Sequence, residues 1–498
     1  MYRCRDMPRP RHRLAVVLLL GAACAPGKQQ ATGPGMTVDA SVSDGAPPDV
    51  AAVADAANVE TGQPDGGGAT GGGAAGTGGN GGDGGNGGMT GAGARGGTGA
   101  SAGSAAGAAG MSAPAGAGGR SQSGGAGGRA APIPVKNLPV IKEMPDPLKM
   151  NDGTKVTTPE QWRLRRQEMI QILEDYEYGH MPPPPGNVKA ATVTATRRVS
   201  ATSALQADYR MLHLTFGPGE ALGFDLGIFT PVPATGAADK FPVLISLTSS
   251  ANDKSIGSAT AALSRGYAVA TVPYQALGAD SSSWATSAFF PAYPDYDWRD
   301  ISAWAWGHMR AVDYLVTDPS VDRDKVMITG TSRLGQAVLL AGALDERIAL
   351  SAPVAAGAAL RFSGKELGGG LGQGITEIVD QNTYWFGPRF AEFRNQTTKL
   401  PCDQHWLPAL TAPRLFIMCN SLMDQYGRAY AAVQTYLAAK PVYDFLGASD
   451  NIGVSFRAGT HGMTSEDWSA ILDFADQYLL KKGGTRKFDV LPPADQLP

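Results

Sequence analysis

Cysteine and histidine are scarce in this chain, which has four cysteines and six histidines among 498 residues. No Cys-x-x-Cys or His-x-x-His spacing occurs, so nothing in the sequence predicts a metal site. Long hydrophobic runs are also lacking, and the apolar run at 14–20 is shorter than the roughly 20 residues of a membrane-spanning helix. The formal net charge is −3. Without a basic patch, the sequence does not favour nucleic-acid binding.

The four cysteines fall into two groups. Cys4 and Cys24 lie near the N-terminus, whereas Cys402 and Cys419 lie in the C-terminal part of the chain with sixteen residues between them. This spacing permits a disulfide in an exported protein. It equally permits two buried thiols, and the sequence leaves both alternatives open.

The N-terminal residues 1–24 have the organisation of an export signal. Several arginines precede the apolar run 14–20, and the small residues 21–23 lead to Cys24. A basic region, a short apolar region and a small-residue processing site are typical of such signals. The end of the segment resembles a bacterial lipobox, which predicts a lipid on Cys24 and a cell-surface location. The alternative is an ordinary cleaved signal and a secreted protein.

Residues 25–131 consist largely of Gly, Ala, Ser, Thr, Asp and Pro. Such a composition has few side chains to bury and cannot offset the entropy cost of ordering the chain. We therefore expect a flexible tether here. The remaining residues, 132–498, have the length of a single hydrolase domain.

The pattern of residues 132–498 predicts an α/β fold. A helix is expected at 162–176, and two alternating segments at 192–199 and 209–216 fit antiparallel strands. Strands and helices then alternate, which is typical of a mostly parallel sheet with helices on both faces. The expected later strands are 241–247, 267–272, 326–329, 348–352, 414–419 and 454–457, and the expected later helices are 258–265, 304–315, 337–344 and 465–481.

One segment of this pattern contains a candidate catalytic residue. A short apolar run at 326–329 meets Gly330, then Ser332, then Gly335, and a helix-prone segment follows. A buried strand, a sharp turn with a serine at its tip and a helix form the nucleophile elbow of α/β-hydrolases. The motif is one residue longer than G-x-S-x-G. We therefore predict an α/β-hydrolase fold, a three-layer sandwich with Ser332 as the nucleophile.

A serine nucleophile needs a histidine base and a carboxylate that orients the imidazole. In α/β-hydrolases these partners follow the serine in the order acid, then histidine. His461 lies in a small-residue loop before the last expected helix, and Asp424 follows the expected strand 414–419. We predict these two as base and acid. The alternatives are a structural loop histidine, a turn-capping aspartate, and Asp450 as a rival acid.

Six segments, read together, resemble a known family. They contain the elbow with Arg333, an Asp-Trp-Arg-Asp helix start, and a Cys-Asp-Gln-His block, and they span residues 297–307, 330–335, 341–348, 384–386, 400–405 and 409–414. The chain is similar here to the glucuronoyl esterases of carbohydrate esterase family 15. The resemblance runs from about 162 to 480. It implies an α/β-hydrolase fold, no cofactor, and cleavage of esters between 4-O-methyl-glucuronic acid on glucuronoxylan and lignin alcohols.

The resemblance also implies residue roles. Ser332 matches the family's nucleophile, His461 its base, and Arg333 the arginine that stabilises the oxyanion; the alternative for Arg333 is a structural ion pair. Gln373 matches a glutamine that contacts the sugar, with a solvated loop residue as its alternative. Many family members place a catalytic glutamate where this chain has Ala355, whereas others use a later aspartate, to which Asp424 corresponds.

Three further positions depart from the family. Gln336 replaces a lysine that binds sugar hydroxyls, Gln381 replaces a glutamate, and Gln425 stands at the position of a tryptophan after the acid. These glutamines, together with Gln373, are the expected substrate contacts. Their neutrality leaves open an esterase acting on another sugar or aryl ester, such as acetyl or feruloyl. A non-catalytic module that binds plant polysaccharide is a further alternative.

An aromatic-rich insertion lies at 278–298. Aromatic faces stack on sugar and lignin-like rings. The insertion therefore predicts either a wall of the binding site or a loop that buries its own aromatic side chains.

Overall fold

The computed structural model of this chain describes residues 131–232, 240–364 and 372–497. The expected export signal, the lipid site at Cys24 and the expected tether, apart from Ala131, lie outside the described residues. Within the described ranges, every helix is too short or too polar to cross a bilayer.

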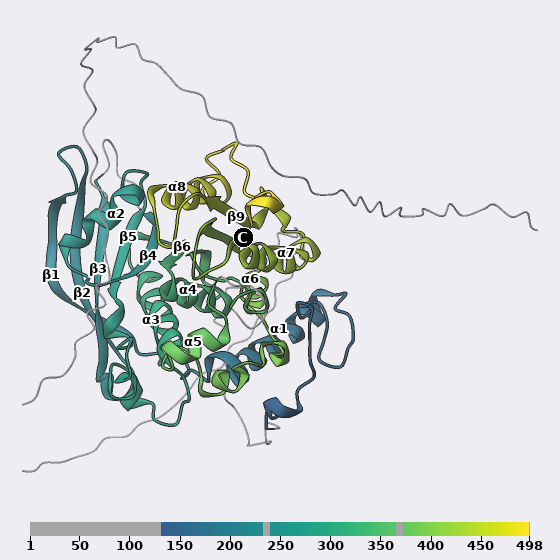
Figure 1. Cartoon of the computed structure of the whole chain (residues 1–498). Coiled ribbons are helices and arrows are strands. Elements are labelled where there is room, and N and C mark those ends of the chain that lie inside the picture. The colour runs from purple at the N-terminus through teal and green to yellow at the C-terminus, as the bar shows by residue number, and fades with distance from the viewer. Residues whose placement is uncertain (1–130, 233–239, 365–371, 498) are drawn as a thin grey trace, which may run out of the picture. The chain divides into compact units, whose positions relative to one another are not determined.

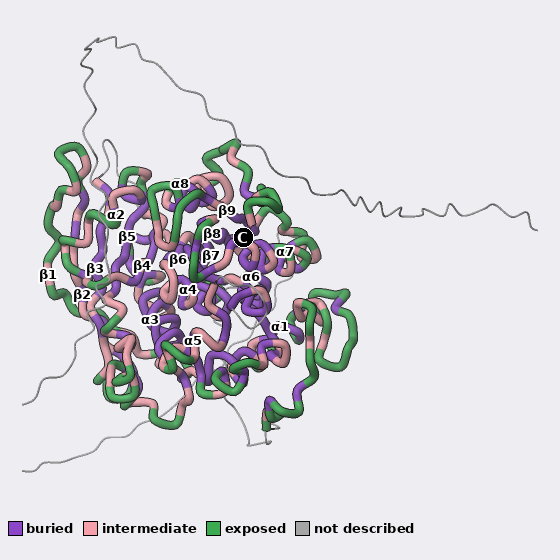
Figure 2. The backbone as a smooth tube through the Cα atoms, viewed as in Figure 1, coloured by how far each residue is buried: buried purple, intermediate pink, exposed green. Residues whose placement is uncertain are grey.

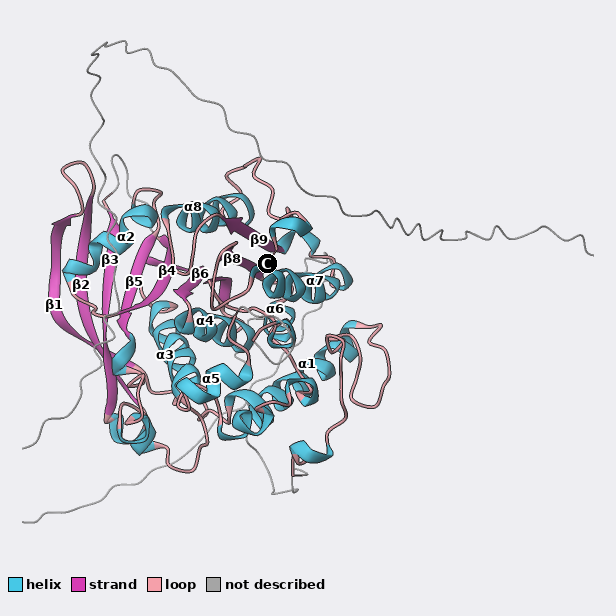
Figure 3. Cartoon of the chain, in the orientation of Figure 1, coloured by secondary structure: helices cyan, strands magenta, loops and turns pink. Residues whose placement is uncertain are grey.

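A nine-stranded sheet forms the centre of the fold, with the strand order β1-β2-β3-β5-β4-β6-β7-β8-β9 (Figures 1 and 3). The first pairings, from β1 to β5, are antiparallel, and those from β5 through β9 are parallel. The strands are β1 (Lys189–Ser200), β2 (Gln206–Phe216), β3 (Leu222–Pro231), β4 (Phe241–Thr248), β5 (Ala268–Pro273), β6 (Val321–Thr331), β7 (Ile348–Val354), β8 (Leu415–Ser421) and β9 (Ile452–Arg457).

Helices cover both faces of this sheet. The α-helices are α1 (Pro159–Leu173), α2 (Ile256–Leu263), α3 (Asp300–Leu315), α4 (Arg333–Leu344), α5 (Ile375–Gln381), α6 (Trp406–Thr411), α7 (Ala429–Phe445) and α8 (Ser465–Phe474). One-turn π-helical extensions continue α1 to Tyr178 and α8 to Leu479. Short 3-10 turns occupy many of the connections.

Two hydrophobic cores lie on opposite faces of the sheet. One core joins the sheet to α2 and α8, which pack together, and the other joins it to α3, α4, α6 and α7. Alternate strand residues supply them, since Leu244 of β4 faces the first core while Val243 and Ile245 face the second. Figure 2 shows that many of the buried residues lie along the central strands. The predicted three-layer sandwich with a mostly parallel sheet is confirmed.

Local sequence explains several element boundaries. Thr158 begins α1 with a capping box, because its side chain accepts from the Gln161 amide while the Gln161 side chain accepts from the Thr158 amide. Pro159 at the first helical position already has the required φ.

The predicted helices and strands are all present, with shifted ends. Strand β3 and helices α5, α6 and α7 were not predicted, because glycines interrupt β3 and prolines lie within α6 and α7.

Both cysteines of the folded domain are free thiols. Cys402 and Cys419 are fully buried and do not pair with each other. Burial raises the pKa of both thiols above the usual value, so they stay protonated at neutral pH. Of the two alternatives left by the sequence, the structure has the pair of buried thiols.

Candidate active site

Ser332 stands at the junction of β6 and α4. The strand residues from Val326 to Gly330 are all buried, and Ser332 adopts a φ of 59° and a ψ of −127° before α4 begins. This left-handed backbone is uncommon outside glycine and is typical of a nucleophile elbow. The Ser332 amide donates to the Val354 carbonyl at 2.9 Å, which fastens the turn to the end of β7.

The elbow depends on close packing behind the serine. A Cβ atom on Gly335 would lie 2.7 Å from the Cβ of Ala356, closer than side chains approach one another. The missing side chain therefore lets the first turn of α4 pack against the loop after β7. This packing brings the serine and that loop to the same edge of the sheet.

His461 and Asp424 meet at that edge from two neighbouring strands. Asp424 lies in the loop after β8, and His461 lies in the loop after β9. The His461 Nδ1 atom lies 3.0 Å from Oδ1 and 2.9 Å from Oδ2 of Asp424. The Asp424 side chain is fully buried, and the imidazole is 19% exposed. A buried carboxylate thus fixes the ring through Nδ1 and leaves Nε2 for proton transfer.

Asp424 is held in its charged form. Burial by itself would raise the pKa of Asp424, but hydrogen bonds outweigh this effect and lower it below the usual value. They come from the His461 ring and from the amides of Gly427 and Tyr426, which donate to Oδ1 at 2.9 and 2.8 Å. The carboxylate therefore remains ionised at neutral pH. The rival Asp450 is exposed in a 3-10 turn before β9.

Arg457, the last residue of β9, shapes the loop that carries His461. Its Nε donates to Asp467 Oδ2 at 2.7 Å, and one terminal nitrogen donates to the carbonyl of Gly462 at 2.5 Å. From β8, the Ser421 hydroxyl donates to the carbonyl of Thr460 at 2.8 Å. These bonds tie the residues on both sides of His461 to the sheet and to α8.

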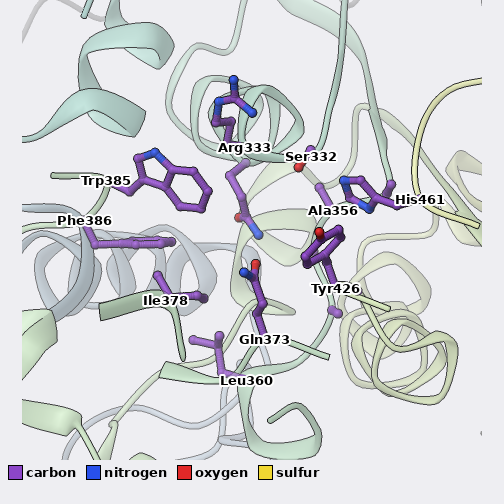
Figure 4. A pocket seen from close by; sticks show the side chains of 15 residues that line it. Ser332, Arg333, Ala356, Leu360, Gln373, Ile378, Trp385, Phe386, Tyr426 and His461 are labelled. Carbon is purple, nitrogen blue, oxygen red and sulfur yellow. The ribbon is translucent and has the colours of Figure 1, made fainter. Parts of the chain in front are cut away.

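Ser332 and His461 line one pocket, which is shown in Figure 4. The pocket contains about 510 Å³ of empty space, a figure that includes space open to solvent. Its wall away from Ser332 is largely apolar. The apolar and aromatic residues of the lining are Leu360, Ile378, Trp385, Phe386 and Tyr426. The lining has fewer polar than apolar residues. A largely apolar pocket with a few polar groups is typical of a small-molecule binding site.

Arg333 follows the nucleophile directly and also lines the pocket. Its Nε lies 2.6 Å from Oδ2 of Asp280 in an ion pair, and its side chain is 30% exposed. Figure 4 shows the Arg333 side chain at the upper edge of the view, above Trp385 and Ser332. The structure therefore shows the ion pair that was the alternative for Arg333, and the oxyanion role stays a prediction.

The four predicted glutamine contacts differ in their positions. Gln336 and Gln373 line the pocket, and Oε1 of Gln336 is buried without a hydrogen-bond partner. Gln381 is exposed and outside the lining, and its Oε1 accepts from Nε2 of Gln373 at 3.2 Å. Gln425 is also exposed and outside the lining, whereas the next residue, Tyr426, is within it.

The aromatic residue after the acid is therefore Tyr426 rather than a residue at position 425. The ring centroid of Tyr426 lies 4.8 Å from that of His461, edge to face. The Gln373 amide donates to the Tyr426 carbonyl at 2.8 Å, which joins the two pocket-lining segments. Sequence spacing did not separate positions 425 and 426, because loop residues lack the periodicity that assigns faces.

Ala355 occupies the position at which, by the family resemblance, many relatives carry a catalytic glutamate. It lies directly after β7, adopts a φ of 49° and lines the pocket. Its amide donates to the Cys419 carbonyl at 2.8 Å. The loop after β7 thus provides no carboxylate at position 355, and the carboxylate that contacts His461 comes from the loop after β8.

The other histidines of the described residues have separate environments. His308 is fully buried, and burial lowers its pKa to about 3. Burial likewise lowers the pKa of His405 to about 4, and its Nε2 lies 2.7 Å from the Pro145 carbonyl. His180 and His213 pair with aspartates. Of these histidines, none lines the pocket that contains Ser332.

The aromatic insertion mainly buries its own side chains. Phe289, Phe290 and Trp298 are buried, and Trp284 packs edge-to-face on Phe290 with ring centroids 5.0 Å apart. None of the aromatic residues in 278–298 lines the pocket, so this segment does not form the predicted wall of the binding site. Trp385 and Phe386, which do line it, belong to the family-like segment 384–386, to which the sequence assigned no role.

Within the described ranges, no group of three or more His, Cys, Asp or Glu residues is placed to hold a metal ion.

Comparison with known proteins agrees with this architecture. The family model described as "Glucuronyl esterase, fungi" matches residues 219–447. "Carbohydrate esterase MZ0003" from an unknown prokaryotic organism is 30% identical over 393 residues, which cover 68% of this chain and 89% of that protein. A "4-O-methyl-glucuronoyl methylesterase" from Podospora anserina is 30% identical over 366 residues, with 70% of each chain covered.

The fold comparison points to the same family. A solved structure of a carbohydrate esterase family 15 glucuronoyl esterase from Caldicellulosiruptor kristjansonii aligns with a TM-score of 0.61 and 30% identity. The alignment covers 72% of this chain and 96% of that one. The predicted α/β-hydrolase fold is therefore confirmed. With its fold, its serine elbow and these relatives in agreement, the chain belongs to the glucuronoyl esterases of carbohydrate esterase family 15, a family of carboxylic ester hydrolases.

Proposed function

We propose that this chain hydrolyses esters of (4-O-methyl-)glucuronic acid on glucuronoxylan, the bonds that join this polysaccharide to lignin alcohols. The observation that carries the proposal is the His461–Asp424 pair, whose side chains are 2.9 Å apart and whose histidine lines the same pocket as Ser332. The names of the relatives support the substrate class. A serine, a histidine and a buried carboxylate supply all the groups that acyl transfer needs.

In the first half of the reaction, Ser332 Oγ attacks the ester carbonyl and His461 Nε2 takes the hydroxyl proton. Asp424 keeps the ring oriented and stabilises the imidazolium through Nδ1. The negative charge on the tetrahedral carbonyl oxygen lies beside the Arg333 amide and guanidinium. Donors of this kind each contribute about 3–4 kcal/mol in other acyl-transfer enzymes. His461 then returns the proton to the departing alcohol as the C–O bond breaks.

In the second half, water hydrolyses the acyl-enzyme. His461 takes a proton from water, the resulting hydroxide attacks the acyl carbonyl, and the intermediate collapses with return of the proton to Ser332 Oγ. The product is the free glucuronic acid. This sequence uses no redox step and no group beyond the side chains named and water.

Alcohol release from benzyl glucuronate tests the proposal. We expect steady turnover by the wild-type protein and its loss in Ser332→Ala, with unchanged far-UV circular dichroism. A serine-directed phosphonate should label the wild type and not the variant. Labelling without turnover of the glucuronate ester would overturn the substrate claim. No labelling and no turnover would favour the alternative of a non-catalytic polysaccharide-binding module.

A second candidate is an esterase of the same mechanism on another sugar or aryl ester, such as acetyl or feruloyl. Gln336 favours it, because a neutral amide forms weaker hydrogen bonds to sugar hydroxyls than a charged amine. The apolar side of the pocket, with Trp385 and Phe386, also suits an aryl group. A substrate panel in which feruloyl or acetyl esters have a higher kcat/KM than glucuronate esters would establish this alternative.

We also propose that the protein is exported and held at the cell surface through a lipid on Cys24, with 25–131 as a tether to the catalytic domain. The basic and apolar N-terminal segment supports export. Palmitate labelling in a bacterial host that is lost in Cys24→Ser would support the anchor. Complete release of unlabelled wild-type protein into the medium would favour an ordinary cleaved signal.

A further inference from the structure

Asp280 connects two residues of the pocket that are far apart in the sequence. It lies in the loop that follows β5, and its side chain is 15% exposed. One carboxylate oxygen, Oδ2, lies 2.6 Å from Arg333 Nε. The other, Oδ1, accepts a hydrogen bond from Trp385 Nε1 at 2.8 Å. A single carboxylate thus contacts both the arginine beside the nucleophile and the tryptophan of the pocket wall.

The Asp280 backbone is itself fixed. Its φ is 55°, an uncommon value for a residue with a side chain, and its amide donates to Oδ2 of buried Asp300 at 2.8 Å. Two residues earlier, the Gly278 carbonyl accepts from Trp304 Nε1 at 3.2 Å. Asp300 and Trp304 belong to α3, so the loop is attached to a buried helix. A carboxylate on this loop therefore has a defined position.

The Arg333 guanidinium has a second neighbour besides Asp280. Arg333 also lies over Tyr274, with 5.7 Å between its Cζ and the ring centroid. Within the described ranges, no other acidic group forms an ion pair with Arg333. An ion pair restrains the guanidinium beside the pocket, where its positive charge can stabilise a negative oxygen that develops at Ser332.

We propose that Asp280 is a positioning residue that holds Arg333 ready for the oxyanion and, through its second oxygen, sets the Trp385 wall of the same pocket. This inference rests on the proposed function, because it assigns Asp280 a role in that reaction through Arg333. Asp280 does not line the pocket, so it acts without touching the substrate. Without it, Arg333 is free to rotate away from Ser332, and the preorganisation that makes such donors effective is lost.

The first test compares Asp280→Ala, Arg333→Ala and the double variant on benzyl glucuronate. We expect Asp280→Ala to lower kcat by roughly 10- to 100-fold with a smaller change in KM, less than the 10²- to 10³-fold loss for a direct oxyanion donor. In the Arg333→Ala background, Asp280→Ala should cause little further loss, since Asp280 acts through that arginine. Losses that multiply, or a change confined to KM, would overturn the proposal.

A second pair of measurements separates positioning from folding. Asp280→Asn retains one acceptor oxygen and should lie between Asp280→Ala and the wild type in kcat. Asp473→Ala removes a comparable, partly exposed carboxylate that pairs with Arg265 at 2.8 Å, and it should keep wild-type kcat. Thermal unfolding of each variant monitors the fold. If Asp280→Ala does not fold, wild-type kcat in a folded Asp280→Asn variant overturns the proposal.

The rate of phosphonate labelling at Ser332 provides a readout that does not depend on the natural substrate. The phosphonate also develops negative oxygen charge, so Asp280→Ala and Arg333→Ala should both slow labelling, and the double variant should match Arg333→Ala. A wild type that labels but does not cleave glucuronate esters would refute the proposed substrate while the labelling rates still decide the role of Asp280. Equal labelling rates in wild type and Asp280→Ala would overturn that role.

Discussion

The Nδ1 atom of His461 lies within 3.0 Å of both carboxylate oxygens of Asp424. Thirty-seven positions separate the two residues in the chain, yet the loops that carry them follow the adjacent parallel strands β8 and β9. Because parallel strands end at the same edge of a sheet, the two loops meet there. The pair therefore depends on the order of the strands as much as on the two side chains.

Replacing Asp424 tests this pair. We expect Asp424→Asn to lower kcat for benzyl glucuronate by about 10⁴-fold, because a neutral amide does not hold the required tautomer of His461 or stabilise the imidazolium. KM should change little. The matched control is Asp450→Asn, the rival acid, which is exposed and should retain full activity. Loss of activity in Asp450→Asn with a fully active Asp424→Asn would contradict the assignment.

Gln336 offers a test of substrate preference. Its Oε1 is buried without a hydrogen-bond partner in the pocket. In Gln336→Lys, a charged amine should bind sugar hydroxyls more strongly and lower KM for glucuronate esters by roughly fivefold, equivalent to about 1 kcal/mol. Gln381→Lys, at an exposed position outside the lining, is the control and should leave KM unchanged. An equal effect of the two substitutions would show that general charge, not the pocket position, determines KM.

Asp300 predicts a pH dependence of stability. Burial raises the pKa of Asp300 from 3.8 to about 7. Between these values the folded protein retains a proton that the unfolded chain has lost, so this group lowers the free energy of unfolding as pH rises from about 4 to about 7. Asp300→Asn removes this titration. The melting temperature of the variant relative to wild type should rise by a few degrees over that range, and a constant difference would contradict the prediction.

The two free thiols predict insensitivity to reducing agents. Cys402 and Cys419 are unpaired and fully buried. We expect the melting temperature to be the same with and without dithiothreitol, and both thiols to react with a maleimide only after denaturation. Loss of a native disulfide typically costs 2–5 kcal/mol. A marked fall of the melting temperature under reduction would therefore show that a disulfide bridge exists in the protein.

Much of the architecture was predictable because it rests on local patterns. The apolar run before Ser332 and the glycines around it indicate a strand, a turn and a helix, and the structure has all of them. The strands that precede the loops of Asp424 and His461 were equally visible. Strand β3 (Leu222–Pro231) was not, because its glycines break the alternation of apolar and polar residues on which such a prediction depends.

The pocket wall was less predictable than the reaction centre. Tyr426 rather than Gln425 faces the pocket, and Trp385 and Phe386 had no assigned place before the structure. These residues lie in loops, where side-chain direction follows from long-range contacts and not from a repeat in the sequence. The aromatic residues at 278–298 had two possible uses, and packing against α3 buried several of them.

The sequence by itself determined the chain order of the candidate residues: a serine at a strand–helix turn, then an aspartate and a histidine after later strands. Local strand and turn patterns, with the chain order usual in α/β-hydrolases, were sufficient for this, since each residue directly follows a recognisable strand. Only the tertiary structure decided that Asp280 contacts both Arg333 and Trp385, because residues 53 and 105 positions apart become neighbours when the sheet and α3 pack. Such contacts between loops arise from the fold as a whole, and no local pattern records them.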